Sequence, residues 1–327
     1  MDYNYQSFLA PVMVQYKEFC IASGCWSTSK HASFVSFDRY CVKHARNEKC
    51  LSQEMADGWC EKKPTEIANS CRSRIYPVIG LLQYMIERGL TEINIPRIPD
   101  GMPCTHVPHL YTEKELAAFF TECDKRLFSD CRLTENKVIA WRLTFPVIMR
   151  FLYSTGCRPY EARMLRRNHI DMLSGVVSIT KSKANIQHYV VLHSSMLSII
   201  KEYDRIIDSL YPDRRHFFLS TNGDQPIHKE WLGCNYKKIW AKISDVPSSP
   251  YDLRHNYAIA NINSWHGTVF DQFNKLVFLS KSLDHICLNS TRYYYHFSTS
   301  LAKLIEERSE IGFNSLLPEV NYAHYDY

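Results

Sequence analysis

The chain has 327 residues, enough for two domains with substantial cores, and its 45% hydrophobic and 22% charged residues are ordinary for a soluble globular protein. The net charge of +5 permits a nucleic-acid partner without arguing for one. The twelve cysteines form no C-x-x-C pair, and no apolar run approaches the ~20 residues that span a membrane. These patterns exclude the common zinc motifs and predict no metal, no other cofactor and no membrane partner. The first residues lack a signal-peptide pattern, so the expected location is the cytoplasm.

The first hundred residues predict three amphipathic helices and a linker. Apolar residues recur at three- and four-residue steps over 6–24, 29–47 and 70–89. Prolines at 96, 99, 103 and 108 then remove backbone donors and disfavour helix, which predicts an extended segment. The predicted organisation is a helical domain over 1–95, a proline-rich linker over 96–110 and a second domain over 111–327.

The second domain is predicted to be mostly helical with a small antiparallel β-sheet. It opens with the capping-box pair Thr112 and Glu115, and a strongly apolar helix over 141–156 ends at Gly156. Alternating β-branched and polar residues over 175–193 predict two or three short strands. Helical spacing is also present over 161–169, 193–211, 229–244, 255–267, 271–283 and 291–310.

Six side chains in the second domain have the chemistry for cutting a phosphodiester without metal. Such an enzyme needs cations on the non-bridging oxygens, a proton donor for the leaving oxygen and a nucleophile. Two arginines supply the phosphate clamp, a lysine with a lowered pKa supplies the proton, and a tyrosine in a cationic pocket supplies the nucleophile. Each local run alone is weak evidence, so the prediction depends on the complete ordered set. The candidate catalytic residues are Arg158, Lys183, Tyr251, Arg254, His285 and Tyr294.

The order and local runs of these residues resemble the tyrosine recombinase (phage integrase) family. The run 151–165 is similar to the family's first-arginine motif, 178–192 to its β-hairpin, 251–258 to its His-x-Leu-Arg-His motif and 279–296 to its nucleophile segment. The resemblance implies an N-terminal helical core-binding domain and a C-terminal tyrosine-recombinase catalytic domain that clamp duplex DNA. It also implies strand cutting through a covalent 3′-phosphotyrosine.

Two assignments within the motifs depend on the family's spacing. Lys181 and Lys183 both lie in the predicted hairpin, and the family's distance to its closing Val-Pro-Leu run favours Lys183 as the general acid. Three tyrosines are adjacent at 293–295, and side chains of neighbouring helical residues point about 100° apart. The family's spacing of nine residues after His285 favours Tyr294 as the nucleophile.

Two positions depart from the family pattern. Tyr251 stands where histidine is commonest, and we expect its phenol to stabilise charge on the phosphate without shuttling protons. Asp284 stands where glycine precedes His285, and it either strengthens a hydrogen bond to that histidine or weakens catalysis. His255 fits the family pattern beside Arg254, and we expect it to orient the site and contact DNA.

Basic side chains on the second and third predicted helices are expected to contact DNA phosphates. The alternative for such charges is a solvated helix face. His31 and His44 lie on the same stretch as several of them. The expected DNA-binding residues are Lys30, Arg39, Lys43, Arg46, Arg72, Arg74 and His255.

The leading hypothesis is a site-specific DNA recombinase that integrates or excises a phage or mobile element. Its expected partners are double-stranded recombination sites, on which a monomeric protein assembles as a homo-tetramer. The resemblance implies that the tail over 300–327 docks on the neighbouring protomer, and the alternative is a tail folded on its own domain. Such an enzyme is expected in the cytoplasm with the nucleoid. One alternative is a type IB topoisomerase-like relaxase, which relaxes supercoils without strand exchange. The other is an architectural DNA-binding protein with a decayed site, which forms no covalent adduct.

Overall fold

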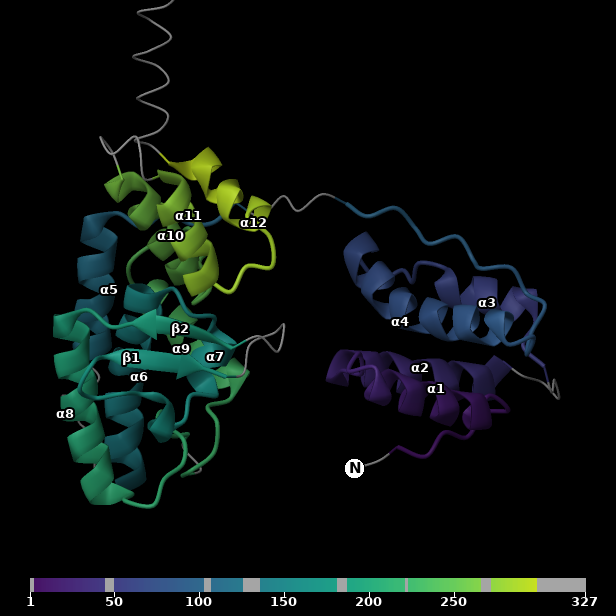
Figure 1. The fold of residues 1–327 in the computed structure, drawn as a ribbon, viewed down its shortest axis with the longest axis horizontal. Coiled ribbons are helices and arrows are strands. Elements are labelled where there is room, and N and C mark those ends of the chain that lie inside the picture. The colour runs from purple at the N-terminus through teal and green to yellow at the C-terminus, as the bar shows by residue number, and fades with distance from the viewer. Residues whose placement is uncertain are drawn as a thin grey trace, which may run out of the picture. The chain divides into compact units, whose positions relative to one another are not determined.

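The computed structural model describes residues 3–44, 50–102, 107–125, 136–180, 187–220, 223–265 and 272–298. The chain divides into two compact units, Met1–His106 and Val107–Tyr327. The described residues are mostly helical with a small antiparallel sheet, which confirms the predicted fold class (Figure 1). Within these ranges the helices are too short or too polar to cross a membrane.

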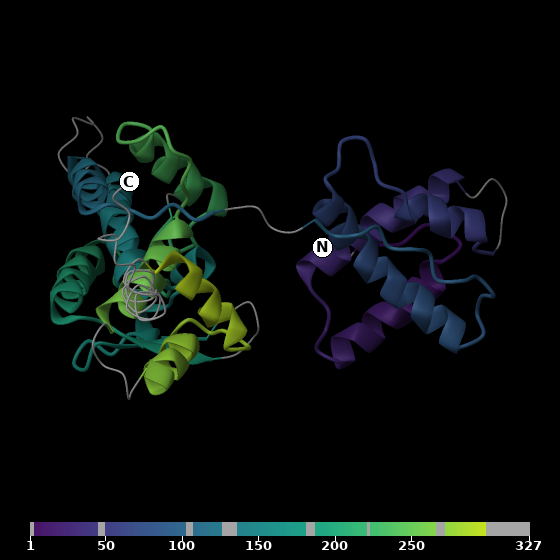
Figure 2. The same ribbon diagram turned by 90° about the horizontal axis from the view of Figure 1, so that it is seen from above.

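The described part of the N-terminal unit is a bundle of four helices (Figures 1 and 2). These are α1 (Ala10–Ala22), α2 (Thr28–His44), α3 (Gln53–Cys60) and α4 (Ala68–Glu87). Helix α4 contacts the other three, because apolar residues at helical spacing along it, from Cys71 to Met85, are buried. Helix α3 was not predicted from the sequence. Its start is marked by Ser52, whose side chain accepts a hydrogen bond from the backbone N–H of Met55 at 3.3 Å.

A buried carboxylate fastens the N-terminal segment to this bundle. Asp38 on α2 is fully buried and accepts hydrogen bonds from the hydroxyl of Tyr3 at 3.0 Å, the backbone N–H of Gln6 at 3.0 Å and the backbone N–H of Ser7 at 2.9 Å. A buried charge is costly unless it is hydrogen-bonded. The three donors therefore hold the segment before α1 in one place.

In the C-terminal unit several helices pack against one apolar helix, α6 (Asn136–Thr155). The elements of its described part are α5 (Glu113–Lys125), α6 (Asn136–Thr155), α7 (Pro159–Arg163), η2 (Arg167–His169), β1 (Val176–Ile179), β2 (His188–Val191), α8 (Ser194–Leu210), α9 (Lys229–Trp240), α10 (Asp252–Ser264), α11 (Gln272–Ser282), α12 (Asn289–Arg292) and η4 (Tyr293–Phe297). Helix α6 contacts α5, α7, α8 and α10. Its Phe145, Ile148, Phe151 and Leu152 are fully buried in the main core of the unit.

The sheet described here has two antiparallel strands. Val176 pairs with Val191, and Ile179 pairs with His188. Alternation along the strands turns Val177, Ile179, His188 and Val190 inward, so a histidine is buried at the start of β2. Figure 1 shows the two strands side by side, and α11 contacts β2.

The predicted helix over 161–169 is wrong in its second half. Helix α7 ends at Arg163, and a short 3₁₀ turn, η2, follows. The backbone from Leu165 to Arg167 is hydrogen-bonded to a distant segment. The carbonyl of Leu165 accepts from the N–H of Phe217 at 2.9 Å, and the N–H of Arg167 donates to the carbonyl of Arg215 at 2.9 Å. These tertiary hydrogen bonds compete with the helical ones.

The C-terminal unit has a second, smaller hydrophobic core, against which the last described residues pack. It joins α10, α11 and η4 through six buried residues: Ala258, Ile259, Ile262, Leu279, Leu283 and Tyr294. One of these residues, Tyr294, is the predicted nucleophile. The position of its phenol is therefore set by the packing of these elements.

Candidate active site

The first candidate arginine lies at the junction between α6 and α7. Helix α6 is followed by Gly156, whose φ of +65° turns the chain in the left-handed region that glycine adopts readily. Arg158 is the residue before α7, and its backbone N–H donates to a carboxylate oxygen of Glu161 at 2.8 Å. Its guanidinium Nη1 donates to the other oxygen of Glu161 at 2.6 Å. The buried Glu161 side chain thus fixes both the backbone and the charge of Arg158.

The second candidate arginine ties three segments together. Arg254 lies in the first turn of α10 and is 1% exposed. Its Nη1 donates to the carbonyl of Gly156 at 2.8 Å, and its Nη2 donates to the carbonyl of Leu283. Its buried Nε has no hydrogen-bond partner among the described residues. The same guanidinium has a side-chain hydrogen bond with Tyr294, which acts to lower the pKa of that phenol.

The segment after α11 brings a carboxylate to the first arginine. The backbone N–H of Asp284 donates to the carbonyl of Lys281 at 3.0 Å, and the backbone N–H of His285 donates to the carbonyl of Ser280 at 3.0 Å. This is the Schellman arrangement that ends a helix with one residue in the left-handed region, here Asp284 at a φ of +52°. The Asp284 carboxylate accepts from Arg158 Nη1 at 2.7 Å, and its carbonyl accepts from Arg158 Nη2 at 2.8 Å.

The candidate histidine is neutral at physiological pH. Burial, together with the charges of Arg254 and Arg158, lowers the pKa of His285 to about 4. Its Nδ1 lies 2.7 Å from the hydroxyl of Thr291, a fully buried residue on α12. Its ring lies parallel to that of Tyr294, with 6.1 Å between centroids and 17° between planes. A neutral imidazole can donate one hydrogen bond. The contacts with Thr291 and Tyr294 fix the plane of the His285 ring.

Of the three adjacent tyrosines, Tyr294 is the buried one. It is 3% exposed, whereas Tyr293 is 40% exposed. Its ring contacts those of His285 and, at 5.5 Å, His255. Burial raises the pKa of Tyr294, and the Arg254 guanidinium acts in the opposite direction. The phenol is therefore protonated at rest, with a cation nearby that stabilises the phenolate.

Tyr251 lies at the edge of this group. It is the residue before α10, is 42% exposed, and its ring meets that of His255 edge-on at 5.1 Å. Tyr251, His255, Tyr294 and His285 therefore form a continuous series of ring contacts. Lys183, like its neighbour Lys181, lies outside the described residues.

One group at the site was not anticipated from the sequence. Ligand atoms of Glu161, His188 and Asp284 all lie within 4.8 Å of one another, a spacing at which a metal ion could bind. Both carboxylates are already bonded to the Arg158 guanidinium, which occupies the place of a cation. Both ring nitrogens of His188 are buried without a hydrogen-bond partner in the described structure, and burial lowers its pKa. The inward position of His188 on β2 follows from strand alternation, which could have revealed it.

Comparison with known proteins assigns the family. Residues 111–300 match the model of the phage integrase family, a segment that includes both arginines and Tyr294. The chain belongs to the phage integrase family. The resemblance predicted from the motifs is thereby confirmed.

Relatives of this integrase-family chain carry matching names. The putative integrase/recombinase y4rE of Sinorhizobium fredii (strain NBRC 101917 / NGR234) is 27% identical over 207 residues, which cover 62% of this chain and 64% of that protein. The match thus spans slightly less than two thirds of y4rE. The putative integrase/recombinase y4rB of the same strain is 24% identical over 279 residues, 80% of this chain and 84% of that protein.

Solved structures of recombinases share the fold of this family member. The post-cleavage complex of the XerH site-specific recombinase with difH DNA matches with a TM-score of 0.60 at 20% identity, over 87% of this chain and 79% of that one. The Tn1549 transposon integrase in complex with transposon right end DNA matches with a TM-score of 0.58 at 14% identity, over 91% and 98% of the two chains. Both likenesses concern the fold.

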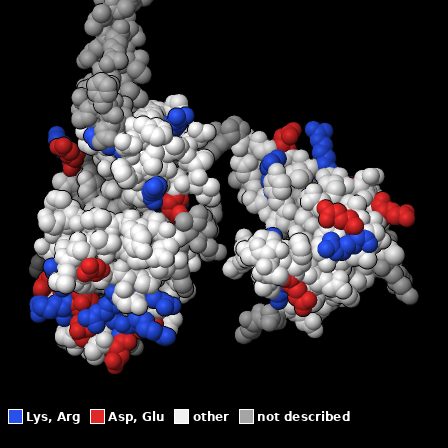
Figure 3. Space-filling view, viewed as in Figure 1, with Lys and Arg blue, Asp and Glu red and all other residues white. Residues whose placement is uncertain are grey.

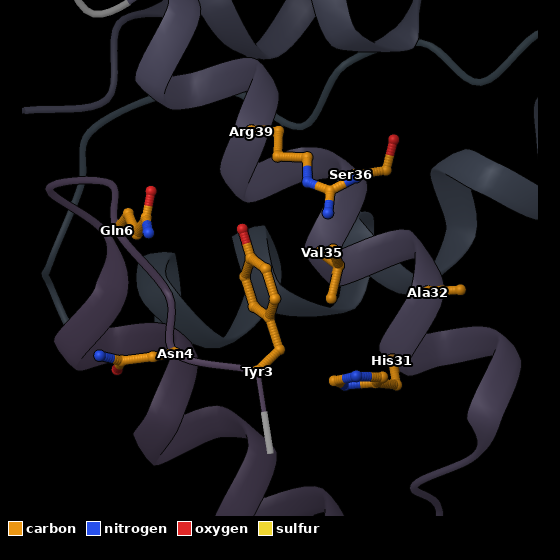
Figure 4. A pocket seen from close by; sticks show the side chains of 8 residues that line it. All are labelled: Tyr3, Asn4, Gln6, His31, Ala32, Val35, Ser36 and Arg39. Atoms are coloured by element: carbon orange, nitrogen blue, oxygen red, sulfur yellow. The ribbon is translucent and has the colours of Figure 1, made fainter. Parts of the chain in front are cut away.

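The predicted DNA contacts on α2 differ in their surroundings. Arg39 and Lys43 are exposed and one helical turn apart, so they share a face of the helix. Arg39 lies 5.8 Å from the ring centroid of Tyr3, and both line a hollow of about 730 Å³ that also includes His31 (Figure 4). The ammonium of Lys30 lies near two cysteine sulfurs. Arg46 lies outside the described residues.

The predicted DNA contacts on α4 are engaged within the unit. Arg74 forms an ion pair with Glu66 at 2.9 Å, donates to the carbonyl of Trp59 and stacks over its ring, with its side chain 12% exposed. Arg72 donates to the carbonyl of Pro99 at 2.6 Å and to the hydroxyl of Tyr76. Arg74 is thus less available for a phosphate than Arg39.

On the face seen in Figure 3 basic and acidic groups are interspersed, in line with the small net charge.

Proposed function

We propose that this protein is a site-specific DNA recombinase that cuts and rejoins strands through a covalent tyrosine–phosphate bond. The observation that carries the proposal is the meeting of Arg158, Arg254, His285 and Tyr294, which come from separate segments, around one site. Two guanidiniums, a neutral imidazole and a phenol are the groups that an attack on a phosphodiester requires.

Each side chain has a role that its surroundings support. The open Nε of Arg254 and the partly exposed guanidinium of Arg158 bind the non-bridging oxygens. Neutral His285 donates a hydrogen bond to the same phosphate, and the exposed Tyr251 adds another from its hydroxyl. Tyr294 releases its phenolic proton to solvent, and the phenolate, stabilised by the Arg254 guanidinium, attacks phosphorus and forms the P–O bond to tyrosine. The 5′ oxygen is expelled and takes a proton from Lys183. The reverse sequence rejoins the strand.

The biological reaction that we propose is movement of a mobile element. The Tn1549 transposon integrase shares the fold over nearly its full length, and a further solved structure with this fold is a lambda integrase tetramer bound to a Holliday junction. We infer that this protein also acts as a tetramer on two DNA sites, with its C-terminal residues 306–327 contributing to assembly. Loss of paired-site complexes on removal of these residues, with single-site binding kept, tests that inference.

The activity can be tested without knowing the target site. The full chain is incubated with nicked duplexes of random sequence, and covalent adducts are separated on a denaturing gel. Sequencing of the captured DNA identifies the site. We expect an adduct with the wild type and none with Tyr294→Phe, while Tyr293→Phe and Tyr295→Phe keep it. Absence of adduct in the wild type refutes recombinase chemistry, and plasmid relaxation without strand exchange supports the topoisomerase alternative.

The proposed clamp can be tested by the salt dependence of DNA binding. We propose that the exposed Arg39 and Lys43 contact phosphates, so alanine at either position should weaken binding to all sequences and reduce the salt slope by about one. Arg74→Ala serves as the comparison, because it removes an internal ion pair and should mainly lower the stability of the unit. An unchanged salt slope in both surface variants contradicts the assignment.

A further inference from the structure

The carboxylate of Asp284 cancels a charge that the proposed reaction needs. Among the described residues at the site, Arg158 and Arg254 are cations, and Glu161 and Asp284 are anions in contact with Arg158. His285 is neutral at physiological pH because its pKa is lowered to about 4. The two arginines and the two carboxylates therefore balance. A phosphodiester, itself an anion, gains less from this site than from one in which Arg158 has a single carboxylate partner.

The structure does not need this carboxylate to end α11. The Schellman arrangement is made by backbone N–H groups and requires only a residue that tolerates a positive φ, for which glycine carries no Cβ penalty. Aspartate at φ +52° is less favourable than glycine there. What the Asp284 side chain adds to the helix end is the hydrogen bond that it accepts from Arg158 Nη1 at 2.7 Å. The bond that the backbone carbonyl accepts from Nη2 at 2.8 Å does not depend on the side chain.

We propose that Asp284 is a positioning residue that acts as an internal counter-anion, holding Arg158 until the scissile phosphate replaces its carboxylate. The inference rests on the proposed recombinase function. Asp284 bonds to Nη1 of Arg158, whose two hydrogens are both used by carboxylates, so a phosphate that binds this nitrogen must displace one of them. Glu161 is the harder one to displace, because it also accepts the backbone N–H of Arg158 and is almost fully buried.

His188 is the group that would receive the displaced carboxylate. Its two ring nitrogens are buried without a hydrogen-bond partner among the described residues, and its ligand atom lies within 4.8 Å of that of Asp284. A neutral imidazole has one N–H to donate, so a short movement of Asp284 towards β2 exchanges the bond to Arg158 for one to His188. Leaving the donor of His188 unpaired in the DNA-free state is costly, and this exchange removes that cost.

The test compares single-turnover rates of adduct formation on a captured nicked duplex. Asp284→Asn keeps the shape of the side chain and removes its charge, and Asp284→Gly removes the side chain at a position that favours glycine. We expect both variants to react faster than the wild type by roughly ten- to a hundredfold, the range of one charge-assisted hydrogen bond. We also expect Asp284→Asn to lower the thermal stability, because the ion pair is lost. Faster chemistry together with lower stability is a combination that a merely structural residue would not give.

Asp204 provides a matched control outside the site. Its carboxylate is also bonded to arginine within the same unit, here to two of them, Arg167 at 3.0 Å and Arg214. Asp204→Asn should lower stability without accelerating adduct formation. A double-mutant cycle tests the role of His188. We expect His188→Phe to slow adduct formation when Asp284 is present and to have little effect on this rate in the Asp284→Gly protein.

The outcomes separate this inference from the proposed function. No adduct with any variant refutes the recombinase function itself. Adduct in the wild type, with equal or lower rates in Asp284→Asn and Asp284→Gly, overturns the counter-anion role and makes Asp284 a group that orients Arg158 productively. Equal acceleration by Asp204→Asn would also overturn it, because the effect would then follow stability and not the site.

Discussion

Gly156 is the position at which one added methyl group should damage the site most. Its φ is +65°, and a Cβ there would lie 2.4 Å from Cδ1 of the Tyr257 ring. The left-handed conformation costs an L-residue about 1–2 kcal/mol, and overpacking of a core costs about 1–3 kcal/mol. We therefore expect Gly156→Ala to lower the free energy of unfolding by about 2–5 kcal/mol.

The same substitution should slow the reaction. The carbonyl of Gly156 accepts the hydrogen bond from Arg254 Nη1 at 2.8 Å, so a shift of this turn moves the acceptor away from a buried guanidinium. Loss of a hydrogen bond to a charged group corresponds to roughly ten- to a hundredfold in rate. Urea unfolding gives the stability change, and single-turnover adduct formation gives the rate change.

Gly223 offers a matched control in the same unit. Its φ is +86°, and an added Cβ would meet no atom within 4 Å. Gly223→Ala should thus carry only the conformational cost of about 1–2 kcal/mol and leave the rate of adduct formation unchanged. Equal stability losses in the two variants, or a Gly156→Ala protein that reacts at the wild-type rate, would refute the reasoning from the Tyr257 contact.

Three further predictions concern other residues. The folded protein binds fewer protons than the unfolded chain at His285, whose pKa is about 4, so the free energy of unfolding should fall by at most about 3 kcal/mol as pH drops from about 6.5 to about 4. His285→Asn should flatten that slope in urea titrations at several pH values. Asp38→Asn should cost about 2–4 kcal/mol, visible as a lower melting temperature, because an amide cannot accept from all the donors that Asp38 binds. Tyr251→Phe should slow adduct formation roughly ten- to a hundredfold and change stability by less than about 0.5 kcal/mol, since the residue is 42% exposed. A variant as fast as the wild type contradicts a hydrogen bond from this phenol.

Periodic patterns in the sequence predicted most of the helices, because these helices have one buried apolar face. The stretches 6–24, 29–47 and 70–89 correspond to α1, α2 and α4. Helix α3 was missed because its eight residues give only two turns of pattern and include a glycine, so its cap was the better signal. The helix predicted to 169 was interrupted by hydrogen bonds to a distant segment, which no local pattern contains.

The candidate site residues could be proposed from the sequence by type and order, but their partners could not. Arg158, Arg254 and Tyr294 lie in recognisable local runs, and the structure places them around one site. The bond between Asp284 and Arg158 joins residues 126 positions apart, and the neighbourhood of His188 depends on how β2 packs. Such contacts arise from tertiary packing, which leaves no periodic trace in the sequence.

The left-handed end of α11 also has an evolutionary consequence. Glycine fits a positive φ without strain, and aspartate and asparagine tolerate it better than other residues do. Codons for aspartate and glycine differ by a single nucleotide. A point mutation at position 284 can therefore add or remove the carboxylate on Arg158 while the helix still ends in the same way. Selection can act there on the charge of the site without remaking the fold.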